Sequence, residues 1–383
     1  MSSVLFVSNG HGEDAIAATI ARQLRALRFA HTDHFPLVGE PVGLPDFAAV
    51  GPQRRLPSGG LIAMFNVRNI LADVRGGLVG LTLAQLRFLR AARRTYQYAV
   101  AVGDVYCLAL ALLAGLPTIF VGTAKSISVA GYGALERAVL RRARHVFVRD
   151  EATAQWLRGR GVAAHAPGNV IVDLLDGDET PPDLGSHAIV LLPGSRSAAY
   201  DDAVALAAIV RAIAGGIPET RAIIAIAPTL HPGVFVQRLR AAGWRVEERG
   251  GPLAFEAFDG DRALISGWTG SLGPALRAAT LAIGQAGTAN EAAAALGLPV
   301  IALDTPVLAG SGWYRRRQMG LLGDALLVVR EAGKRAADAI IELLGDETRL
   351  AHMRSAGPKR LGGAGGARAI ARTIHDDLGA ISA

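Results

Sequence analysis

One stretch of the chain, residues 280–304, has the order strand, turn, helix and strand, and this order restricts the fold strongly. A short apolar run at its start predicts a buried strand. Small residues follow at 284–288, and a helical pattern then continues until Gly297 ends it. A second apolar run, residues 300–303, predicts another buried strand. Because ligands of open parallel sheets bind where such turns lie, we expect a ligand site here.

The start of this helix allows two interpretations. The free N–H groups of a helix N-terminus can bind a phosphate, and Glu291 would then lie beside a ligand. Thr288 and Glu291 also have the spacing of a capping box, in which Glu291 would bond to a backbone N–H and touch no ligand. The spacing alone leaves both interpretations open.

Apolar strand runs and helical patterns alternate through most of the chain, which predicts parallel, doubly wound sheets. One acidic stretch, residues 174–187, is rich in proline and glycine and lacks periodicity. Such a stretch is typical of a linker between domains. The sequence therefore predicts an α/β protein with two similar domains, and the cleft between them is the default active site.

The domain boundaries follow from this linker. We expect residues 1–175 to form an N-terminal domain, residues 176–187 the linker, and residues 188–365 a C-terminal domain. We expect a last helix at residues 366–383, with the option of packing back on the N-terminal domain.

The charge of the chain favours anionic partners. Its formal net charge is +7 over 383 residues, which suits a nucleotide diphosphate or an anionic membrane surface. We find no zinc-ligand spacing, no RNA-binding aromatic motif and no basic tail, so we expect no nucleic acid partner. Cys107 is the only cysteine, which excludes an intramolecular disulfide. No signal-peptide pattern is visible at the start, so we expect a cytoplasmic protein.

Residues 56–94 carry six arginines among apolar residues, and their only acid is Asp73. A basic amphipathic surface of this kind can lie on an anionic bilayer. We therefore expect peripheral attachment to the inner face of the cell membrane. The alternative is an ordinary helix pair with a solvated arginine face.

The N-terminal half offers candidate groups for acid–base chemistry. Asp104 follows a buried strand at residues 98–102, which places an acid at the mouth of a loop, where a general base is well positioned. Its other interpretation is a cap for the next helix. His11 lies in a glycine loop at residues 9–12 and is either a loop residue without chemistry or a group that faces the active site. This loop is not a full dinucleotide fingerprint.

A second glycine turn, at residues 193–196, follows a strand predicted at residues 188–192. The planar guanidinium of Arg196 could pair with a diphosphate. Two glycine turns in one doubly wound domain, with Glu291 downstream, indicate a nucleotide site.

These motifs resemble a known family. Residues 191–196, LLPGSR, resemble a signature of the bacterial lipid-A-disaccharide synthases. Residues 287–291 and 297–300 resemble the donor-binding segment of that family and of MurG-like glycosyltransferases. Residues 168–173 resemble the segment that closes the first domain of the synthases, and Asp104 matches the position of their proposed catalytic aspartate. The resemblance covers most of the chain and implies a GT-B fold, in which two Rossmann-like domains face each other across a cleft.

The resemblance implies that the C-terminal domain binds a UDP-sugar, which is a substrate, with no cofactor. Arg196 would meet the phosphates, and Glu291 would hold the ribose hydroxyls. Thr288 and Asn290 would help to form the phosphate turn. The donor-binding residues implied in this way are Gly194, Ser195, Arg196, Gly287, Thr288, Asn290, Glu291 and Gln318. Gln318 resembles the glutamine that contacts the donor sugar in MurG-like enzymes.

The N-terminal domain would bind the acceptor, with Asn9, Gly10 and Gly12 as contact residues. The synthases usually carry Gly-Glu-x-Ser-Gly-Asp in this loop, and here only the final acid, Asp14, matches clearly. His11 instead resembles the Gly-His loop of MurG-like enzymes. The usual Pro-Asp-Phe after the catalytic aspartate is also missing. We therefore interpret the chain as a synthase-related protein whose acceptor can differ, rather than as the synthase itself.

We accordingly expect an inverting glycosyltransferase that moves a sugar, of the N-acetylhexosamine type, from a UDP-sugar to a lipid or glycolipid acceptor. Asp104, His11 and Asp14 are the candidate catalytic residues, and the choice of base among them stays open. Residues 176–178 and 259–261 match the Asp-x-Asp metal motif of another glycosyltransferase fold, but they lie in predicted surface turns, so we assign no metal.

Two other functions stay open. A UDP-N-acetylglucosamine 2-epimerase-like enzyme would share the fold and would need no lipid acceptor. A non-catalytic protein that binds a nucleotide sugar or a lipid would keep Arg196 and Glu291 and would tolerate the loss of Asp104. The sequence also leaves open whether the chain forms a homodimer.

Overall fold

The computed structural model describes residues 2–27, 30–37, 47–53, 78–123, 125–304, 312–330 and 333–382. The chain divides into two compact units. Unit 1 comprises residues 1–174 and 364–383, and unit 2 comprises residues 175–363. Much of the expected membrane-binding segment, residues 56–77, lies outside the described residues.

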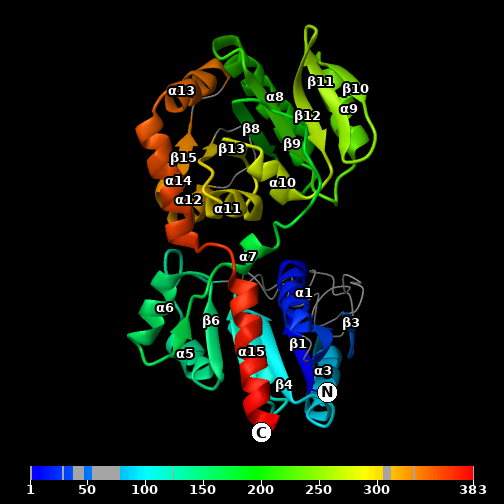
Figure 1. Ribbon diagram of the computed structural model, residues 1–383, viewed down its shortest axis with the longest axis vertical. Helices are drawn as coiled ribbons and strands as arrows, with labels where there is room; N and C mark the ends of the chain where they lie inside the picture. The colour runs from blue at the N-terminus through cyan, green and yellow to red at the C-terminus, as the bar shows by residue number, and fades with distance from the viewer. Residues whose placement is uncertain are drawn as a thin grey trace. The chain divides into compact units, whose positions relative to one another are not determined.

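Unit 1 is built around a seven-stranded sheet in which every strand pair is parallel (Figure 1). The strand order is β3-β2-β1-β4-β5-β6-β7. The strands are β1 (Ser2–Ser8), β2 (Ala30–Pro36), β3 (Ala48–Ala49), β4 (Tyr98–Gly103), β5 (Thr118–Gly122), β6 (His145–Val148) and β7 (Ala164–His165). The helices are α1 (His11–Ala26), α3 (Leu78–Ala92), α4 (Val105–Leu112), α5 (Ala134–Leu140), α6 (Glu151–Arg158), α7 (Val170–Asp173) and α15 (Gly366–Ser382).

The side chains of β1 alternate between two cores, because successive residues of a strand point to opposite faces of the sheet. Leu5 and Val7 pack with apolar residues of α3, α4, α5 and α6. Val4 and Phe6 pack with α1 and with α15 on the other face (Figure 1). Both faces of the sheet are therefore covered, which explains why its central strands are nearly continuous apolar runs.

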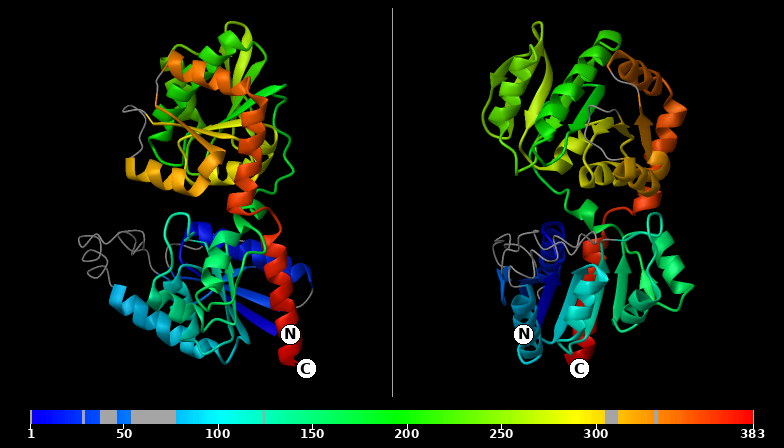
Figure 2. Two further views of the ribbon diagram at one scale, coloured as in Figure 1. Left: turned by 90° about the vertical axis from the view of Figure 1, so that its left-hand side faces the viewer. Right: turned by 180° about the vertical axis from the view of Figure 1, so that it is seen from behind.

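Unit 2 contains an eight-stranded sheet of order β10-β11-β12-β9-β8-β13-β14-β15. Figure 2 shows the ribbon of this unit from two further sides. The strands are β8 (His187–Leu192), β9 (Thr220–Ala225), β10 (Arg245–Glu248), β11 (Leu253–Asp259), β12 (Arg262–Trp268), β13 (Leu281–Gly284), β14 (Val300–Leu303) and β15 (Leu326–Val329). The helices are α8 (Ala199–Gly216), α9 (Pro232–Ala241), α10 (Leu272–Arg277), α11 (Thr288–Ala295), α12 (Gly312–Leu322), the 3-10 turn η1 (Gly323–Ala325), α13 (Lys334–Leu344) and α14 (Glu347–Leu361).

The sheet of unit 2 differs from the expected parallel pattern at one edge. Neighbouring strands pair in parallel from β12 through β9, β8, β13 and β14 to β15, whereas β10 pairs antiparallel with β11 and β11 pairs antiparallel with β12.

The expected surface turn at residues 259–261 connects β11 to β12, and Gly260 adopts φ +60° there. Asp259 forms an ion pair with Arg211 at 3.0 Å. Within the described ranges, no three or more histidine, cysteine or acidic side chains are grouped so as to hold a metal ion.

The chain leaves unit 1 after Leu174 and returns to it at Ala364. At this point the carboxylate of Asp173 accepts hydrogen bonds from the backbone N–H groups of Gly365 and Ala367, at 2.6 and 2.7 Å. Asp173 therefore caps the N-terminus of α15 and holds the two crossing segments together.

None of the helices that the structure describes is long and apolar enough to cross a membrane.

Candidate functional site

The two glycine turns of unit 2 lie side by side, because β8 and β13 are neighbouring parallel strands. Leu192, the last residue of β8, is in register with Gly284, the last residue of β13. The backbone N–H groups of Gln285 and Ala286 both donate to the carbonyl oxygen of Leu192, at 2.9 and 3.1 Å. Both turns therefore start at one level of the carboxyl edge of the sheet, where the sequence predicted a ligand site.

The first turn, residues 193–196, presents an open backbone. Gly194 has φ +121°, a conformation that favours glycine, and a Cβ at this position would meet no atom within 4 Å. The hydroxyl of Thr229 donates to the carbonyl of Ser195 at 2.9 Å and holds the turn. Ser195 and Arg196 are exposed, so an anionic ligand can reach the guanidinium.

The second turn leads directly into α11. The N-cap of this helix is Gly287, and Thr288 is its first helical residue. The capping box with Thr288 as N-cap is therefore wrong, because the residue at the N-cap position has no side chain. The backbone N–H of Glu291 donates to the carbonyl of Gly287 at 3.1 Å, and the Glu291 side chain is half-buried. Thr288 is exposed at the start of the helix.

Asn290 lies behind the second turn. Its side chain is fully buried, and its Nδ2 donates to the carbonyl of Gly284 at 3.2 Å. A Cβ on Gly284 would lie only 1.9 Å from Asn290 Oδ1, so the two residues fit only because one is glycine. Asn290 thus supports the turn from inside the unit.

Gln318, on α12, is also an internal support of this turn. It is 5% exposed, and its Nε2 donates to the carbonyl of Ala286 at 2.9 Å. Its Oε1 accepts a hydrogen bond from Arg315. Both polar atoms of the Gln318 side-chain amide are therefore hydrogen-bonded within unit 2. Sequence reasoning missed Arg315, which is buried although the next residue, Arg316, is exposed.

In unit 1, the glycine loop after β1 is shorter than expected. Gly10 is the N-cap of α1, so His11 and Gly12 are helical residues rather than loop residues. The backbone N–H of Asp14 donates to the carbonyl of Gly10 at 2.8 Å and closes the first turn of the helix. The side chain of His11 lies outside the described part of the structure.

Asp104 is the N-cap of α4, and its Oδ1 accepts a hydrogen bond from the backbone N–H of Cys107 at 2.9 Å. Its side chain is half-buried. The preceding residue, Gly103, has φ +137°, and a Cβ there would lie 2.0 Å from Asn9 Oδ1. The structure therefore brings Asn9, from the predicted acceptor loop, next to the turn that carries Asp104.

Asp14 belongs to a buried cluster with two residues that sequence reasoning missed. The hydroxyl of Ser8 donates to Asp14 Oδ1 and also lies at hydrogen-bond distance from His34 Nε2, both at 2.6 Å. The His34 ring stacks on Phe47 with centroids 4.9 Å apart. Asp14 is 1% exposed, so it holds the start of α1 from within. Its partners could not be found from spacing, because His34 lies on the neighbouring strand β2.

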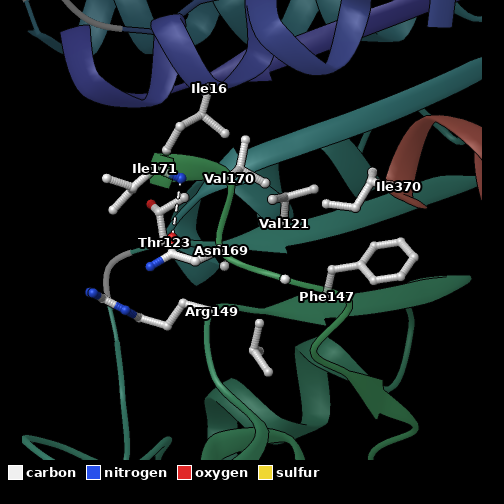
Figure 3. A pocket seen from close by; sticks show the side chains of 12 residues that line it. Ile16, Val121, Thr123, Phe147, Arg149, Asn169, Val170, Ile171 and Ile370 are labelled. Carbon is white, nitrogen blue, oxygen red and sulfur yellow. Dashed lines mark hydrogen bonds between the residues drawn. The ribbon is translucent and has the colours of Figure 1, made fainter. Parts of the chain in front are cut away.

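A small pocket opens at the carboxyl ends of β5 and β6 (Figure 3). Its walls are mostly apolar, and its polar lining side chains are Thr123, Arg149 and Asn169. Asn169 accepts a hydrogen bond from the backbone N–H of Ile171 at 3.1 Å and so caps α7. The Thr123 hydroxyl donates to Glu13 at 3.2 Å, which links this pocket to the first turn of α1. Asn9, Gly10 and Gly12 are not among its lining residues.

No family model matches this sequence, and no curated protein matches it. Solved structures do match. The UDP-GlcNAc 2-epimerase from Neisseria meningitidis, bound to UDP-GlcNAc, aligns at 13% identity over 98% of this chain and 100% of that chain, with a TM-score of 0.58. The calicheamicin glycosyltransferase CalG4 aligns at 15% identity over 99% and 98%, with a TM-score of 0.58. MurG from Acinetobacter baumannii aligns at 13% identity over 98% and 100%, with a TM-score of 0.54.

At these identities the likeness concerns the fold alone. It extends over nearly the whole length of each chain, and it includes both glycosyltransferases and epimerases. The protein therefore has the GT-B fold of two Rossmann-like α/β domains, as the sequence predicted.

Proposed function

We propose that this protein binds a UDP-sugar in unit 2 and transfers the sugar, with inversion, to a lipid or glycolipid acceptor. The observation that carries the proposal is the placement of two glycine turns on adjacent parallel strands, at Leu192 and Gly284, beside the N-terminus of α11. Helix N-termini favour phosphate groups, and the exposed Arg196 adds a cation. The similarity to an enzyme bound to UDP-GlcNAc supports the ligand class.

Within this donor site each residue has a defined role. Arg196 and the backbone of the turn at Gly194 bind the diphosphate. The N–H groups that follow Gly287 bind it from the start of α11. Glu291, half-buried in the first turn of α11, accepts hydrogen bonds from the ribose hydroxyls. Asn290 and Gln318 act from behind, since both are buried.

The transfer step needs a base and a stabilised leaving group. Asp104 of unit 1, or His11, takes the proton from the acceptor hydroxyl. The acceptor oxygen then bonds to the anomeric carbon while the bond from that carbon to the diphosphate oxygen breaks. UDP leaves with the electron pair, and the dipole of α11 and Arg196 stabilise its added charge. Asp14 is too deeply buried to meet a substrate and keeps a supporting role.

The acceptor class rests on the resemblance to lipid-A-disaccharide synthases and on the arginines near α3. Arg87 and Arg90 lie exposed on this helix, while Leu81 and Leu89 on its other face are buried. This arrangement suits attachment to an anionic bilayer, and we place the protein at the cytoplasmic face of the membrane.

A UDP-N-acetylglucosamine 2-epimerase is the second candidate. The TM-score to the Neisseria epimerase equals the one to CalG4, so the fold favours both classes alike. An epimerase would act on UDP-GlcNAc alone, whereas a glycosyltransferase needs an acceptor. The products therefore separate the two functions.

The test has two stages. Calorimetry should show UDP binding to the native protein, and both Arg196→Ala and Glu291→Ala should weaken it. UDP-GlcNAc is then incubated with and without a bacterial glycolipid extract. We expect UDP release only when the extract is present. Formation of the 2-epimer without an acceptor would establish the epimerase, and UDP binding with no product in either mixture would indicate a binding protein. An absence of UDP binding would overturn the proposal.

A further inference from the structure

The buried side chain of Arg315 holds together three parts of unit 2. It lies on α12 and is 2% exposed. Its Nη1 donates to Gln318 Oε1 at 2.5 Å, and its Nη2 donates to Gln285 Oε1 at 2.5 Å. Nη2 also donates to the carbonyl of Leu303 at 2.9 Å, at the end of β14. One guanidinium thus joins α12, the turn after β13 and the end of β14.

Gln318 passes this connection on to the backbone of the turn after β13, and Gln285 is itself a residue of that turn. Gln318 Nε2 donates to the carbonyl of Ala286, and Gln285 Nε2 donates to the carbonyl of Leu303, each at 2.9 Å. The backbone N–H groups of Gln285 and Ala286 are bound by Leu192 on β8. Residues 285 and 286 are therefore fixed from two sides, immediately before the N-cap Gly287.

The chemistry of the side chain explains why an arginine occupies this place. A guanidinium is planar and offers five N–H donors in a fixed fork, whereas an ammonium is a compact donor without that geometry. A buried polar network is favourable when its groups are hydrogen-bonded, and it then becomes rigid. Arg315 can satisfy both glutamines and a backbone carbonyl at once, which a lysine cannot reproduce.

We propose that Arg315 is a positioning residue for the diphosphate of the donor. It sets the backbone at residues 285–287, and so the direction of the N–H groups at the start of α11, before the ligand binds. This inference rests on the proposed function, because it concerns the same donor site. Its distinctive consequence is unequal. The N–H groups that face the phosphates follow directly after residues 285 and 286, whereas Glu291, which holds the ribose, lies one turn further along α11. Recognition of the phosphates therefore depends on the network more than recognition of the nucleoside does.

The experiment compares affinity for UDP with affinity for uridine, which lacks the phosphates. The variants are Arg315→Lys, which keeps the charge, and Gln318→Ala, which removes the link to Ala286. Arg316→Ala is the matched control, because this neighbour on α12 is exposed. We expect UDP affinity to fall by about tenfold to a hundredfold in the first two variants, since the loss of one hydrogen bond to a charged group has an effect of that size. Uridine affinity should fall much less than UDP affinity, and the control should match the native protein.

Circular dichroism first establishes which variants fold. If Arg315→Lys does not fold, Gln318→Ala decides, because it removes a single connection. Unchanged UDP affinity in the folded variants would overturn the inference, and so would an equal loss for UDP and uridine, which indicates a general structural role. If the native protein binds UDP and the variants bind it equally well, only this inference fails. If the native protein does not bind UDP, the proposed function fails and this inference fails with it.

Discussion

The carboxylate of Asp104 accepts a hydrogen bond from the backbone N–H of Cys107 at 2.9 Å. This bond fixes the first turn of α4 and uses one carboxylate oxygen. Because the side chain is only half-buried, capping the helix and taking a proton are compatible roles for the same group. An asparagine can replace the carboxylate as a helix cap but not as a proton acceptor.

Asp104→Asn should therefore fold normally and lose activity. Asparagine caps helices as well as aspartate does, so the melting temperature should stay close to that of the native protein. Loss of a general base should lower the transfer rate by about a hundredfold to ten-thousandfold. UDP affinity, measured by calorimetry, should be unchanged because the proposed donor site lies in unit 2. As a control, Asp104→Ala should also lose about 1 kcal/mol of stability with the cap. Full turnover by Asp104→Asn, with loss in His11→Ala, would make His11 the base.

Gly284→Ala should destabilise unit 2. The added Cβ would lie 1.9 Å from Asn290 Oδ1 inside a packed core, and overpacking of this kind typically destabilises by about 1–3 kcal/mol. Urea unfolding measures the effect. Adding Asn290→Ala should relieve the clash, so the double variant should lose less stability than the sum of the two single variants. Gly215→Ala is the control, because a Cβ there would meet no atom within 4 Å and alanine favours a helix. Strict additivity would contradict this account.

Acid should weaken the attachment of α15. Burial raises the pKa of the Asp377 carboxyl, but hydrogen bonds from Arg144 and Tyr98 lower it, and the pKa is lowered overall. A lowered pKa means that the stabilisation is present above the ordinary value of about 3.9 and is lost as the pH falls below it. Thermal unfolding between pH 2 and 7, in steps of about one unit, should show this loss. Asp377→Asn should have a lower melting temperature at neutral pH and a flatter acid profile. Parallel profiles would remove Asp377 from the explanation.

The arginines of α3 should direct binding to anionic vesicles. Arg87 and Arg90 are exposed, and each basic contact near such a surface contributes roughly 1 kcal/mol. Arg87→Glu with Arg90→Glu should reduce co-sedimentation with anionic vesicles, and added salt should weaken the binding of the native protein. Arg335→Glu, exposed on α13 in unit 2, is the control. Equal binding of the native protein to neutral and anionic vesicles would contradict attachment through these arginines.

The sequence was sufficient to predict most of the fold, because buried parallel strands leave continuous apolar runs. Both strands that flank α11, β13 and β14, could be recognised from one stretch of residues. Strand β11 was missed for the opposite reason. It pairs antiparallel with β10 and β12, next to the edge of the sheet, and is only partly buried, so its residues do not form a continuous apolar run.

The candidate site was predictable only where its geometry is local. Gly194 marks a turn in the sequence itself, because its backbone conformation favours glycine. Arg315 could not be distinguished from Arg316, since burial of one of them depends on where α12 lies relative to the turn after β13 and the end of β14. Gln318 was assigned from resemblance, and its contact with Ala286 depends on the same packing. The cluster of Ser8 and His34 likewise depends on the pairing of two strands.

The return of the chain to unit 1 as α15, which Asp173 caps, also has a consequence for the order in which the chain folds. Ile370, Ile374 and Leu378 of α15 complete one core of unit 1, yet the ribosome adds them only after the whole of unit 2. Unit 2 is continuous in sequence and has its segments together earlier. The strands of unit 1 are therefore synthesised first, but one face of their sheet stays partly uncovered until α15 has been made. Unit 1 begins to be synthesised before unit 2 and completes its core after it.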